Sequence, residues 1–367
     1  MQTFDVSFRE SSRRTRVRVG RGALAPLPAE LAAAVPGARL ALVSDDRVMP
    51  LHGRRLAARL QAAGLAVECF EFPAGESGKT RAAKAVLEDA FLARGIGRDA
   101  AVLAVGGGVT GDLAGYLAAT WHRGIPVVQV PTSVLAMVDA SIGGKTGVNL
   151  AGAKNVVGAF HQPLAIYADT TVLETLPDRD FRAGFAEVVK VALIGDGSLF
   201  DTLEGSVDEL LGRDAETLDL VIGVAMRIKA AVVVRDEREG GARAALNFGH
   251  TVGHALEVCS GFALSHGEAV ATGMVVEADL AAAVHDFPQE GVRRLAELLR
   301  RLGLPTVVPA TLETDALFRA MRLDKKTRGG EIRYALPVAP GAMPAAPATS
   351  VEVSDRLVAA AIERRKG

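Results

Sequence analysis

The feature that most constrains this chain is a series of short apolar runs that alternate with longer segments of helical character over its first half. The runs end at polar or glycine-rich residues and cover 39–46, 65–73, 101–108, 126–133 and 164–171. Such alternation is typical of a parallel sheet built from βαβ units, because parallel strands must be joined by long crossovers. Before these runs, the period-two segments 4–8 and 15–19 predict a β-hairpin.

From about Pro177 the pattern changes to long Ala/Leu/Val segments with a period near 3.6, which predict helices over 180–195, 216–234 and 291–303. We therefore predict two domains, an α/β domain over 1–176 and a mostly helical domain over 177–367.

The composition excludes several classes of protein. Lys and Arg number 42 against 43 Asp and Glu, so no bulk field recruits nucleic acid or a membrane surface. The two cysteines, Cys69 and Cys259, give no disulfide framework, which suits a reducing compartment. The first ten residues do not resemble a signal peptide, and no apolar run reaches the roughly 20 residues of a membrane span. We expect a cytoplasmic protein with no nucleic-acid or membrane partner.

The segment NFGHTVGHALE, residues 247–257, places His250 and His254 one helical turn apart on one face. A zinc protease would carry Glu directly after the first His, and here that residue is Thr251, so this class is excluded. Glu187 lies in an apolar helical segment, three residues before Lys190. A buried carboxylate needs a cation or a metal beside it, whereas an ordinary exposed Glu–Lys pair is the alternative.

A further histidine, His266, lies at another predicted helix start. Zinc sites with an open position commonly use three His or Glu ligands. The sequence offers four candidates for three positions: Glu187, His250, His254 and His266. The residues alone do not decide which imidazole is left out, so this depends on the geometry of the fold.

Glycine-rich segments predict anion binding. Residues 101–112 join an apolar run to a helix start through three glycines, which would let backbone N–H groups approach a phosphate, although a plain tight turn uses glycines too. Asp45 follows another strand and suits ribose hydroxyls, with helix capping as the alternative. Lys145 and Lys154 lie in what we interpret as glycine-rich loops, where exposed lysines without a ligand are the alternative.

These motifs, taken in order, resemble the 3-dehydroquinate synthase family over almost the whole chain. The resemblance rests on residues 106–124, 130–149, 153–163, 175–190, 236–257, 265–275 and 322–326. It implies a Rossmann-like parallel-sheet domain over 1–176 that binds NAD. It also implies a helical domain over 177–367 that binds substrate and a divalent metal, zinc or cobalt.

The resemblance also assigns roles to single residues. The implied metal ligands are Glu187, His250 and His266, which leaves His254 to face the substrate. The implied NAD contacts are Asp45, Glu76, Lys79, Gly107, Gly108, Val109, Asp112, Thr132, Ser133, Asp139, Lys154 and Thr175. The implied substrate contacts are Lys145, Asn155, Lys190, Lys229, Arg243, Asn247, His254, Lys325 and Lys326. Arg123 would reach across the interface of a homodimer.

The implied activity is conversion of 3-deoxy-D-arabino-heptulosonate 7-phosphate to 3-dehydroquinate and phosphate, a lyase step of the shikimate pathway toward aromatic amino acids. A substrate with a carboxylate and a phosphate needs a cluster of Lys, Arg and Asn. The nearest alternative is a sister sugar phosphate cyclase that makes 2-deoxy-scyllo-inosose or a valiolone. Lys229, Arg243 and His254 favour the synthase, because the substrates of the sisters lack the carboxylate. A polyol dehydrogenase and a non-catalytic descendant are more distant alternatives.

Overall fold

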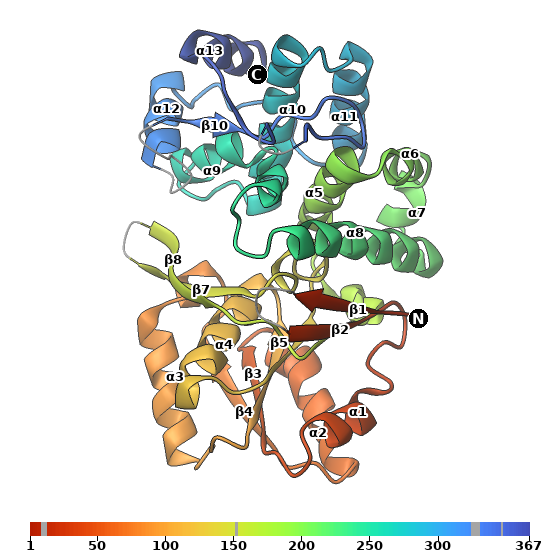
Figure 1. Ribbon diagram of the computed structural model, residues 1–367, viewed down its shortest axis with the longest axis vertical. Helices are drawn as coiled ribbons and strands as arrows, with labels where there is room; N and C mark the ends of the chain where they lie inside the picture. The colour runs from red at the N-terminus through yellow and green to blue at the C-terminus, as the bar shows by residue number, and fades with distance from the viewer. Residues whose placement is uncertain (9–12, 151–152, 324–330, 346–347) are drawn as a thin grey trace. The chain divides into compact units, whose positions relative to one another are not determined.

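The computed structural model describes residues 1–8, 13–150, 153–323, 331–345 and 348–367. The chain forms two compact units. The first comprises Met1–Pro177 with Leu218–Met226, and the second comprises Asp178–Thr217 with Arg227–Gly367. Figure 1 shows the sheet with its helices in the first unit and the helices of the second.

The first unit is built on a seven-stranded sheet with the order β1-β2-β9-β6-β5-β3-β4. Its strands are β1 (Gln2–Phe8), β2 (Arg13–Val19), β3 (Leu40–Asp45), β4 (Val67–Phe72), β5 (Ala101–Gly106), β6 (Val127–Pro131) and β9 (Ala165–Ala168). β1 and β2 form an antiparallel hairpin, and every other neighbouring pair in the sheet is parallel. The predicted hairpin and the five predicted parallel strands are therefore confirmed.

Helices cover both faces of this sheet, so its central strands are apolar at successive residues. On β3, Leu40 and Leu42 face a core formed with α1 (Leu27–Ala34) and α2 (Arg54–Ala62). Ala41 and Val43 face the opposite core, formed with α3 (Arg81–Ala93) and α4 (Gly108–Thr120).

The strand order reverses between β3 and β5. From β3 the chain proceeds to β4 on one side, and then to β5, β6 and β9 on the other. In open α/β sheets, ligands bind beyond the carboxyl ends of the strands at such a switch point. Asp45 ends β3, and Gly107 directly follows β5, so both lie at this edge of the sheet.

A second, two-stranded sheet packs on α4 and corrects one interpretation of the sequence. It consists of β7 (Lys145–Leu150) and β8 (Ala153–Phe160), paired antiparallel. Lys145 and Lys154 thus lie in strands and not in glycine-rich loops. The glycines are needed because the strands approach closely: a Cβ atom on Gly158 would lie 1.9 Å from the Thr146 carbonyl oxygen.

The second unit is mostly helical. Its elements are α5 (Asp178–Gly195), α6 (Gly197–Gly205), α7 (Val207–Leu211), α8 (Ala215–Arg235), α9 (His250–Cys259), α10 (His266–Val284), α11 (Gln289–Arg301), α12 (Thr314–Leu323), α13 (Asp355–Arg364) and the short strands β10 (Arg333–Tyr334) and β11 (Val351–Glu352). The middle of α8 belongs to the first unit, where Asp219 accepts a hydrogen bond from Thr170. The helices predicted over 180–195, 216–234 and 291–303 are confirmed as α5, α8 and α11.

α10 is the central helix of this unit. It packs against α5, α9, α11 and α13, and it is buried almost continuously from Ala269 to Ala281. A helix that is apolar on all sides must be surrounded by protein, which explains its Ala/Val-rich sequence. The predicted class, a parallel-sheet α/β part followed by a mostly helical part, is confirmed.

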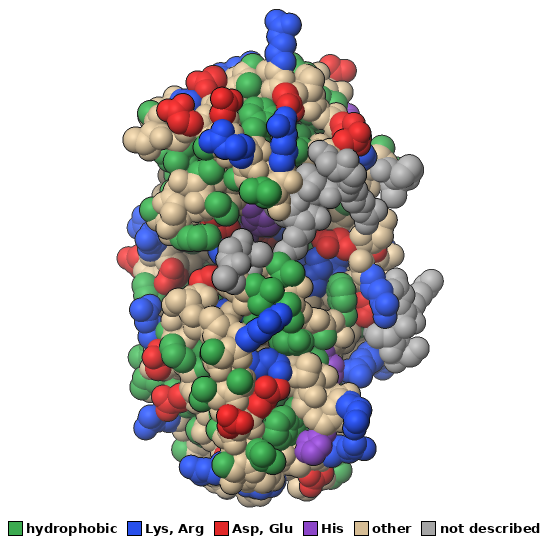
Figure 2. All heavy atoms as spheres, turned by 90° about the vertical axis from the view of Figure 1, so that its left-hand side faces the viewer, with side chains coloured by type: hydrophobic (Ala, Val, Ile, Leu, Met, Phe, Trp, Pro, Cys, Tyr) green, Lys and Arg blue, Asp and Glu red, His purple; other side chains and the backbone are tan. Residues whose placement is uncertain are grey.

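The described surface carries charges of both signs. On the face drawn in Figure 2, the described acidic and basic side chains are interspersed. Within the described part of the chain, no helix combines the length and apolarity needed to cross a bilayer.

Candidate functional site

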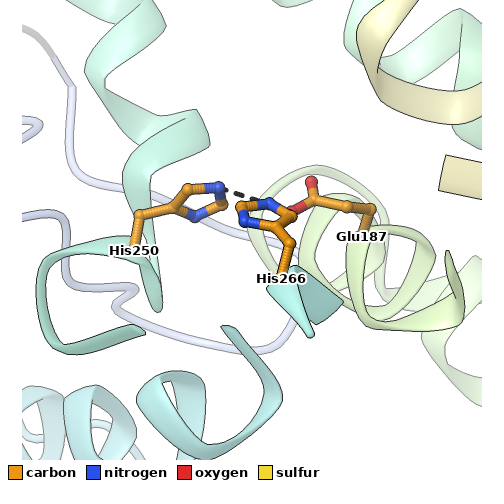
Figure 3. Close-up of side chains that lie close together, drawn as sticks. All are labelled: Glu187, His250 and His266. Atoms are coloured by element: carbon orange, nitrogen blue, oxygen red, sulfur yellow. Dashed lines mark ion pairs between the residues drawn. The ribbon is translucent and has the colours of Figure 1, made fainter. Parts of the chain in front are cut away.

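Three side chains from separate helices converge in the second unit. Glu187 comes from α5, while His250 and His266 are the first residues of α9 and α10 (Figure 3). Glu187 Oε1 lies 3.4 Å from His250 Nε2 and 3.5 Å from His266 Nε2. Two ligands held tetrahedrally at about 2.1 Å from one zinc ion would be about 3.4 Å apart. The three side chains therefore fit a single divalent ion.

The two oxygens of the Glu187 carboxylate have different neighbours. Oε1 faces both histidines, whereas Oε2 forms an ion pair with Lys190. The side chains of Glu187 and Lys190 are each only 1% exposed. The alternative of an ordinary solvent-exposed pair is therefore wrong, and Lys190 places a buried positive charge beside the carboxylate.

Neighbouring groups define the orientation of both imidazoles. His250 Nδ1 lies 3.1 Å from the Phe248 carbonyl oxygen, which can only accept a hydrogen bond, so Nδ1 carries the proton. The Nε2 lone pair then faces Glu187. His266 Nδ1 lies 3.5 Å from Glu257 Oε2. Burial lowers the pKa of His266, but its contacts with Glu187 and Glu257 outweigh burial and raise this pKa to about 9.

The third imidazole lies beside the first two. The ring of His254 is 5.3 Å from that of His250 and 6.0 Å from that of His266, measured between ring centroids. His254 also forms a second group with Glu257 and His266, in which the potential ligand atoms lie within 4.8 Å of one another. The predicted side-by-side placement of His250 and His254 on one helix is confirmed, and the substrate-facing role of His254 stays a prediction.

Close helix contacts hold the two helix starts in place. A Cβ atom on Gly273 of α10 would lie 2.1 Å from the Gly249 carbonyl oxygen, and one on Gly267 would lie 2.0 Å from that of Ala183 in α5. Glu277 of α10 accepts hydrogen bonds from the backbone N–H groups of Gly249, at 2.7 Å, and Val252, at 3.0 Å. Because Gly249 has no side chain to cap α9, this buried carboxylate performs that function.

The other substrate-contact candidates of the second unit lie on α8 and in the turn after it. Lys229 is a buried residue of α8, and Arg243 and Asn247 belong to the turn Ala242–Asn247. Arg243 is buried and its Nη1 donates to the Glu237 carbonyl oxygen at 2.5 Å. Lys325 and Lys326 lie outside the described residues.

The turn that carries Arg243 is organised by Asp236. The Asp236 carboxylate accepts hydrogen bonds from the backbone N–H groups of Gly240, Gly241 and Arg243, at 2.7, 2.7 and 2.9 Å. Burial raises the pKa of Asp236, but these three donors outweigh burial and lower it. The carboxylate therefore stays ionised and fixes the backbone of Arg243.

In the first unit, Lys79 joins residues predicted to bind NAD and substrate. Its Nζ donates to Asp112 at 2.5 Å and to Asn155. Burial raises the pKa of Asp112, although the Lys79 charge acts in the opposite direction. Asn149 links Glu76 to the same group, since it donates to Glu76 at 2.8 Å and accepts from Asn155 N–H at 2.9 Å.

The glycine segment lies at the switch point of the sheet. Gly107 precedes α4, Gly108 and Val109 are its first residues, and no side chain caps this helix start. A Cβ atom on Gly107 would lie 3.8 Å from Ser133 Oγ. Thr132 directly follows β6. Asp139 lies in the helical turn Ala136–Ala140, and its charge raises the pKa of Asp112. Uncapped N–H groups at a helix start suit a phosphate.

Asp45 accepts hydrogen bonds in the turn that follows β3. Its Oδ1 accepts from the backbone N–H groups of Arg47 and Val48, and its Oδ2 accepts from Thr110 at 3.1 Å. These bonds close the turn before the helix Met49–Gly53, whose N-cap residue is Val48 and which has no side-chain cap, so the capping alternative is not confirmed. The ribose contact stays a prediction.

The remaining candidates of the first unit are Thr175, Lys145, Lys154 and Arg123. Thr175 Oγ1 lies 2.7 Å from His52 Nε2, and Lys145 is exposed while Lys154 is half-buried. Arg123 is exposed with φ +68°, directly after His122 with φ +48°. Two successive non-glycine residues in the left-handed region are strained, which is typical of functional segments.

Comparison with known proteins settles the family. The model of the 3-dehydroquinate synthase N-terminal domain matches residues 69–183, and that of the C-terminal domain matches 184–327. The 3-dehydroquinate synthase of Symbiobacterium thermophilum is 46% identical over 338 residues, which are 91% of this chain and 94% of the relative. This chain belongs to the 3-dehydroquinate synthase family.

Solved structures of sister cyclases share the fold. A 2-deoxy-scyllo-inosose synthase complexed with carbaglucose-6-phosphate, NAD+ and Co2+ has a TM-score of 0.87 and 26% identity, covering 99% of this chain and 100% of its own. The 2-epi-5-epi-valiolone synthase of Streptomyces hygroscopicus subsp. jinggangensis, with NAD+ and Zn2+ bound, has a TM-score of 0.83 and 31% identity, covering 99% and 98%. The resemblance inferred from the sequence is thus confirmed.

Sequence analysis missed three residues that the structure connects to these groups. They are Asn149, between Glu76 and Asn155, Glu257, beside His266, and Glu277, which caps α9. Glu277 had a detectable signal: like Glu187, it is an acidic residue within an apolar helical segment. Glu257 follows His250 by seven residues, which is two turns along the same helix face.

Proposed function

We propose that this protein is a 3-dehydroquinate synthase, a carbon–oxygen lyase that converts 3-deoxy-D-arabino-heptulosonate 7-phosphate to 3-dehydroquinate and phosphate. The course of the reaction is a transient oxidation, β-elimination of phosphate, reduction and intramolecular aldol cyclisation. The convergence of Glu187, His250 and His266 at ligand spacing, in a chain 46% identical to a 3-dehydroquinate synthase, is the observation that carries this proposal.

Bound NAD would supply a reversible hydride acceptor, and a bound zinc or cobalt ion would supply a Lewis acid for a substrate hydroxyl. Glu187, His250 and His266 would hold the ion. Residues 1–176 form the proposed NAD-binding domain. Its candidate contacts are Asp45, Glu76, Lys79, Gly107, Gly108, Val109, Asp112, Thr132, Ser133, Asp139, Lys154 and Thr175.

Residues 177–367 form the proposed metal- and substrate-binding domain. The substrate carries a carboxylate and a phosphate, and the buried cations Lys190, Lys229 and Arg243 suit these anions. His254 is proposed to hydrogen-bond the substrate beside the ion. Asp236 holds the backbone of Arg243, and the Glu237 carbonyl oxygen accepts from its guanidinium, so both ends of this residue are oriented.

The sister cyclases are the structural neighbours, but the sequence favours the synthase. Identity to 3-dehydroquinate synthases reaches 46%, against 26% and 31% for the two sister enzymes. A substrate without a carboxylate would leave part of the Lys and Arg set without a partner, which disfavours that substrate by charge alone.

We also propose a cytoplasmic homodimer in which Arg123 reaches the neighbouring subunit. The exposure and backbone strain of Arg123 support a role outside its own fold. Sedimentation should give twice the chain mass. In mixed dimers of wild-type and Arg123→Ala subunits, activity should fall only in proportion to the number of active sites that receive the substituted residue.

The direct test supplies the heptulosonate phosphate with NAD and Zn2+ or Co2+, and measures phosphate and dehydroquinate. Both products should form in equal amounts, NAD should not be consumed, and a chelator should stop turnover. A sugar phosphate of similar size without the carboxylate is the matched control substrate. Faster turnover of that control would refute the proposal in favour of a sister cyclase, and undiminished turnover by Glu187→Ala or His250→Ala would refute the metal ligands.

A further inference from the structure

We propose that Glu257 is a positioning residue for His266: its carboxylate accepts the Nδ1–H of this imidazole and so directs the Nε2 lone pair toward the metal. The inference rests on the proposed function, since it concerns the same metal site. It assigns a role to a residue that is not among the three proposed ligands.

The geometry places His266 between two carboxylates. Its Nε2 lies 3.5 Å from Glu187 Oε1, and its Nδ1 lies 3.5 Å from Glu257 Oε2. The two nitrogens of the ring thus have different acidic neighbours on opposite sides. A neutral imidazole has one N–H and one nitrogen lone pair, so only one of its two nitrogens can bind a metal ion.

Burial indicates that Glu257 has a specific partner. Its side chain is 8% exposed, although it lies on α9 between Leu256 and the exposed Val258. An ionised carboxylate in such surroundings needs a hydrogen-bond donor or a positive charge. The Nδ1–H of His266 supplies a donor from the neighbouring helix.

The same residues could be interpreted as a second metal site, because His254, Glu257 and His266 also bring ligand atoms within 4.8 Å of one another. Chemistry disfavours that interpretation. His266 would have to offer lone pairs from both nitrogens, which requires loss of both ring protons. When a carboxylate instead accepts the N–H of the ring nitrogen that does not bind the metal, the ring keeps this proton. Such an acceptor also makes the ring more basic.

The two histidines of the site are then oriented by different acceptors. His250 donates its Nδ1–H to a neutral backbone carbonyl, that of Phe248, whereas His266 donates to a charged side chain. The charged acceptor is the only one of the two that a substitution can remove. Removal of such an acceptor typically lowers metal affinity about 10- to 100-fold.

The test measures Zn2+ affinity of the metal-free full-length protein by competition with a chromophoric chelator, and records the visible spectrum of the Co2+ form. Glu257→Ala should weaken Zn2+ binding about 10- to 100-fold, and Glu257→Gln, which keeps a neutral acceptor, by less. Both should shift the Co2+ spectrum. Glu257→Asp should restore part of the affinity. The control is Glu297→Gln, which removes the charge of an exposed helical glutamate paired with Arg300.

Several results would overturn the inference. One is a Zn2+ dissociation constant within twofold of the wild type for Glu257→Gln, with an unchanged Co2+ spectrum; this variant decides the question if Glu257→Ala does not fold. Another is a loss of affinity that only follows a fall in the unfolding midpoint of the metal-free protein. Failure of the wild type to bind Zn2+, or binding unaffected by His250→Ala, would instead refute the proposed function, and this inference with it.

Discussion

Substitution of Glu277 tests how the helix that begins with His250 is held. In Glu277→Gln the side-chain amide oxygen can still accept from one of the two backbone N–H groups of Gly249 and Val252. The other N–H would face an NH2 group and lose its acceptor. Since the whole side chain is buried, water cannot replace that acceptor.

The expected magnitude follows from these two bonds. A buried donor without a partner costs about 1–3 kcal/mol, and exchanging a charged for a neutral acceptor weakens the remaining bond by about 1 kcal/mol. Relief of carboxylate desolvation acts in the opposite direction. We expect a net loss of about 2 kcal/mol in the free energy of unfolding, which corresponds to a fall of about 4 °C or more in the melting temperature.

The assay is urea and thermal unfolding of the metal-free protein, followed by circular dichroism. Glu290→Gln is the matched control, because Glu290 forms an exposed pair with Arg293 on α11 and such pairs contribute about 0.5 kcal/mol or less. Zn2+ affinity should also fall in Glu277→Gln, because His250 is the first residue of the helix that Glu277 caps. A destabilisation no larger than that of the control would refute the capping role.

Three further changes test other contacts. Gly267→Ala should weaken Zn2+ binding at least tenfold in a chelator competition, because the added methyl group would push α10 away from α5. Asp112→Asn should destabilise the first unit and weaken NAD binding, measured by calorimetry, because it leaves the buried Lys79 without its charged partner. Arg18→Met should reduce the loss of stability between pH 6 and pH 3. The hydrogen bond from Arg18 lowers the pKa of Glu30, so this pair stabilises the fold above the unfolded pKa of about 4.3 and is lost as pH falls through the folded pKa.

Each of these changes has a control. Gly205→Ala adds the same methyl group where nothing lies within 4 Å, and it should leave Zn2+ binding unchanged. Lys84 and Glu88 form an ion pair within α3, and neither is a proposed NAD contact, so Glu88→Gln should leave NAD binding intact. An Arg18→Met variant whose acid sensitivity equals that of the wild type would contradict the proposed linkage.

The parts of the fold that could be predicted are those in which local pattern and tertiary environment agree. The central strands are covered on both faces, so they appear as continuous apolar runs such as Ala101–Gly106. The adjacent placement of His250 and His254 follows from helix geometry alone. In these segments, the residue types and their spacing are enough to predict the secondary structure and the buried face.

Other features depend on contacts that no local pattern contains. The segment with Lys145 is rich in glycine, which lowers strand propensity, yet it forms β7 because Gly147 and Gly158 allow two backbones to approach. The meeting of Glu187 with His250 depends on how α10 packs against α5 and α9. Spacing in the sequence left three imidazoles as candidates, and only the family resemblance chose between them.

The close approach of α10 to its neighbours has a consequence for how the protein acquires its ion. Backbone contacts at Gly267 and Gly273 hold the start and middle of α10 against α5 and α9, and the ligand atoms of Glu187, His250 and His266 lie within 4.8 Å of one another. Small zinc domains fold only when the ion is bound, so that the free energy of zinc binding is also their free energy of folding. Because the contacts at Gly267 and Gly273 involve protein atoms alone, we expect a chelator to stop turnover while cooperative unfolding persists, and we expect added Zn2+ to restore turnover without refolding.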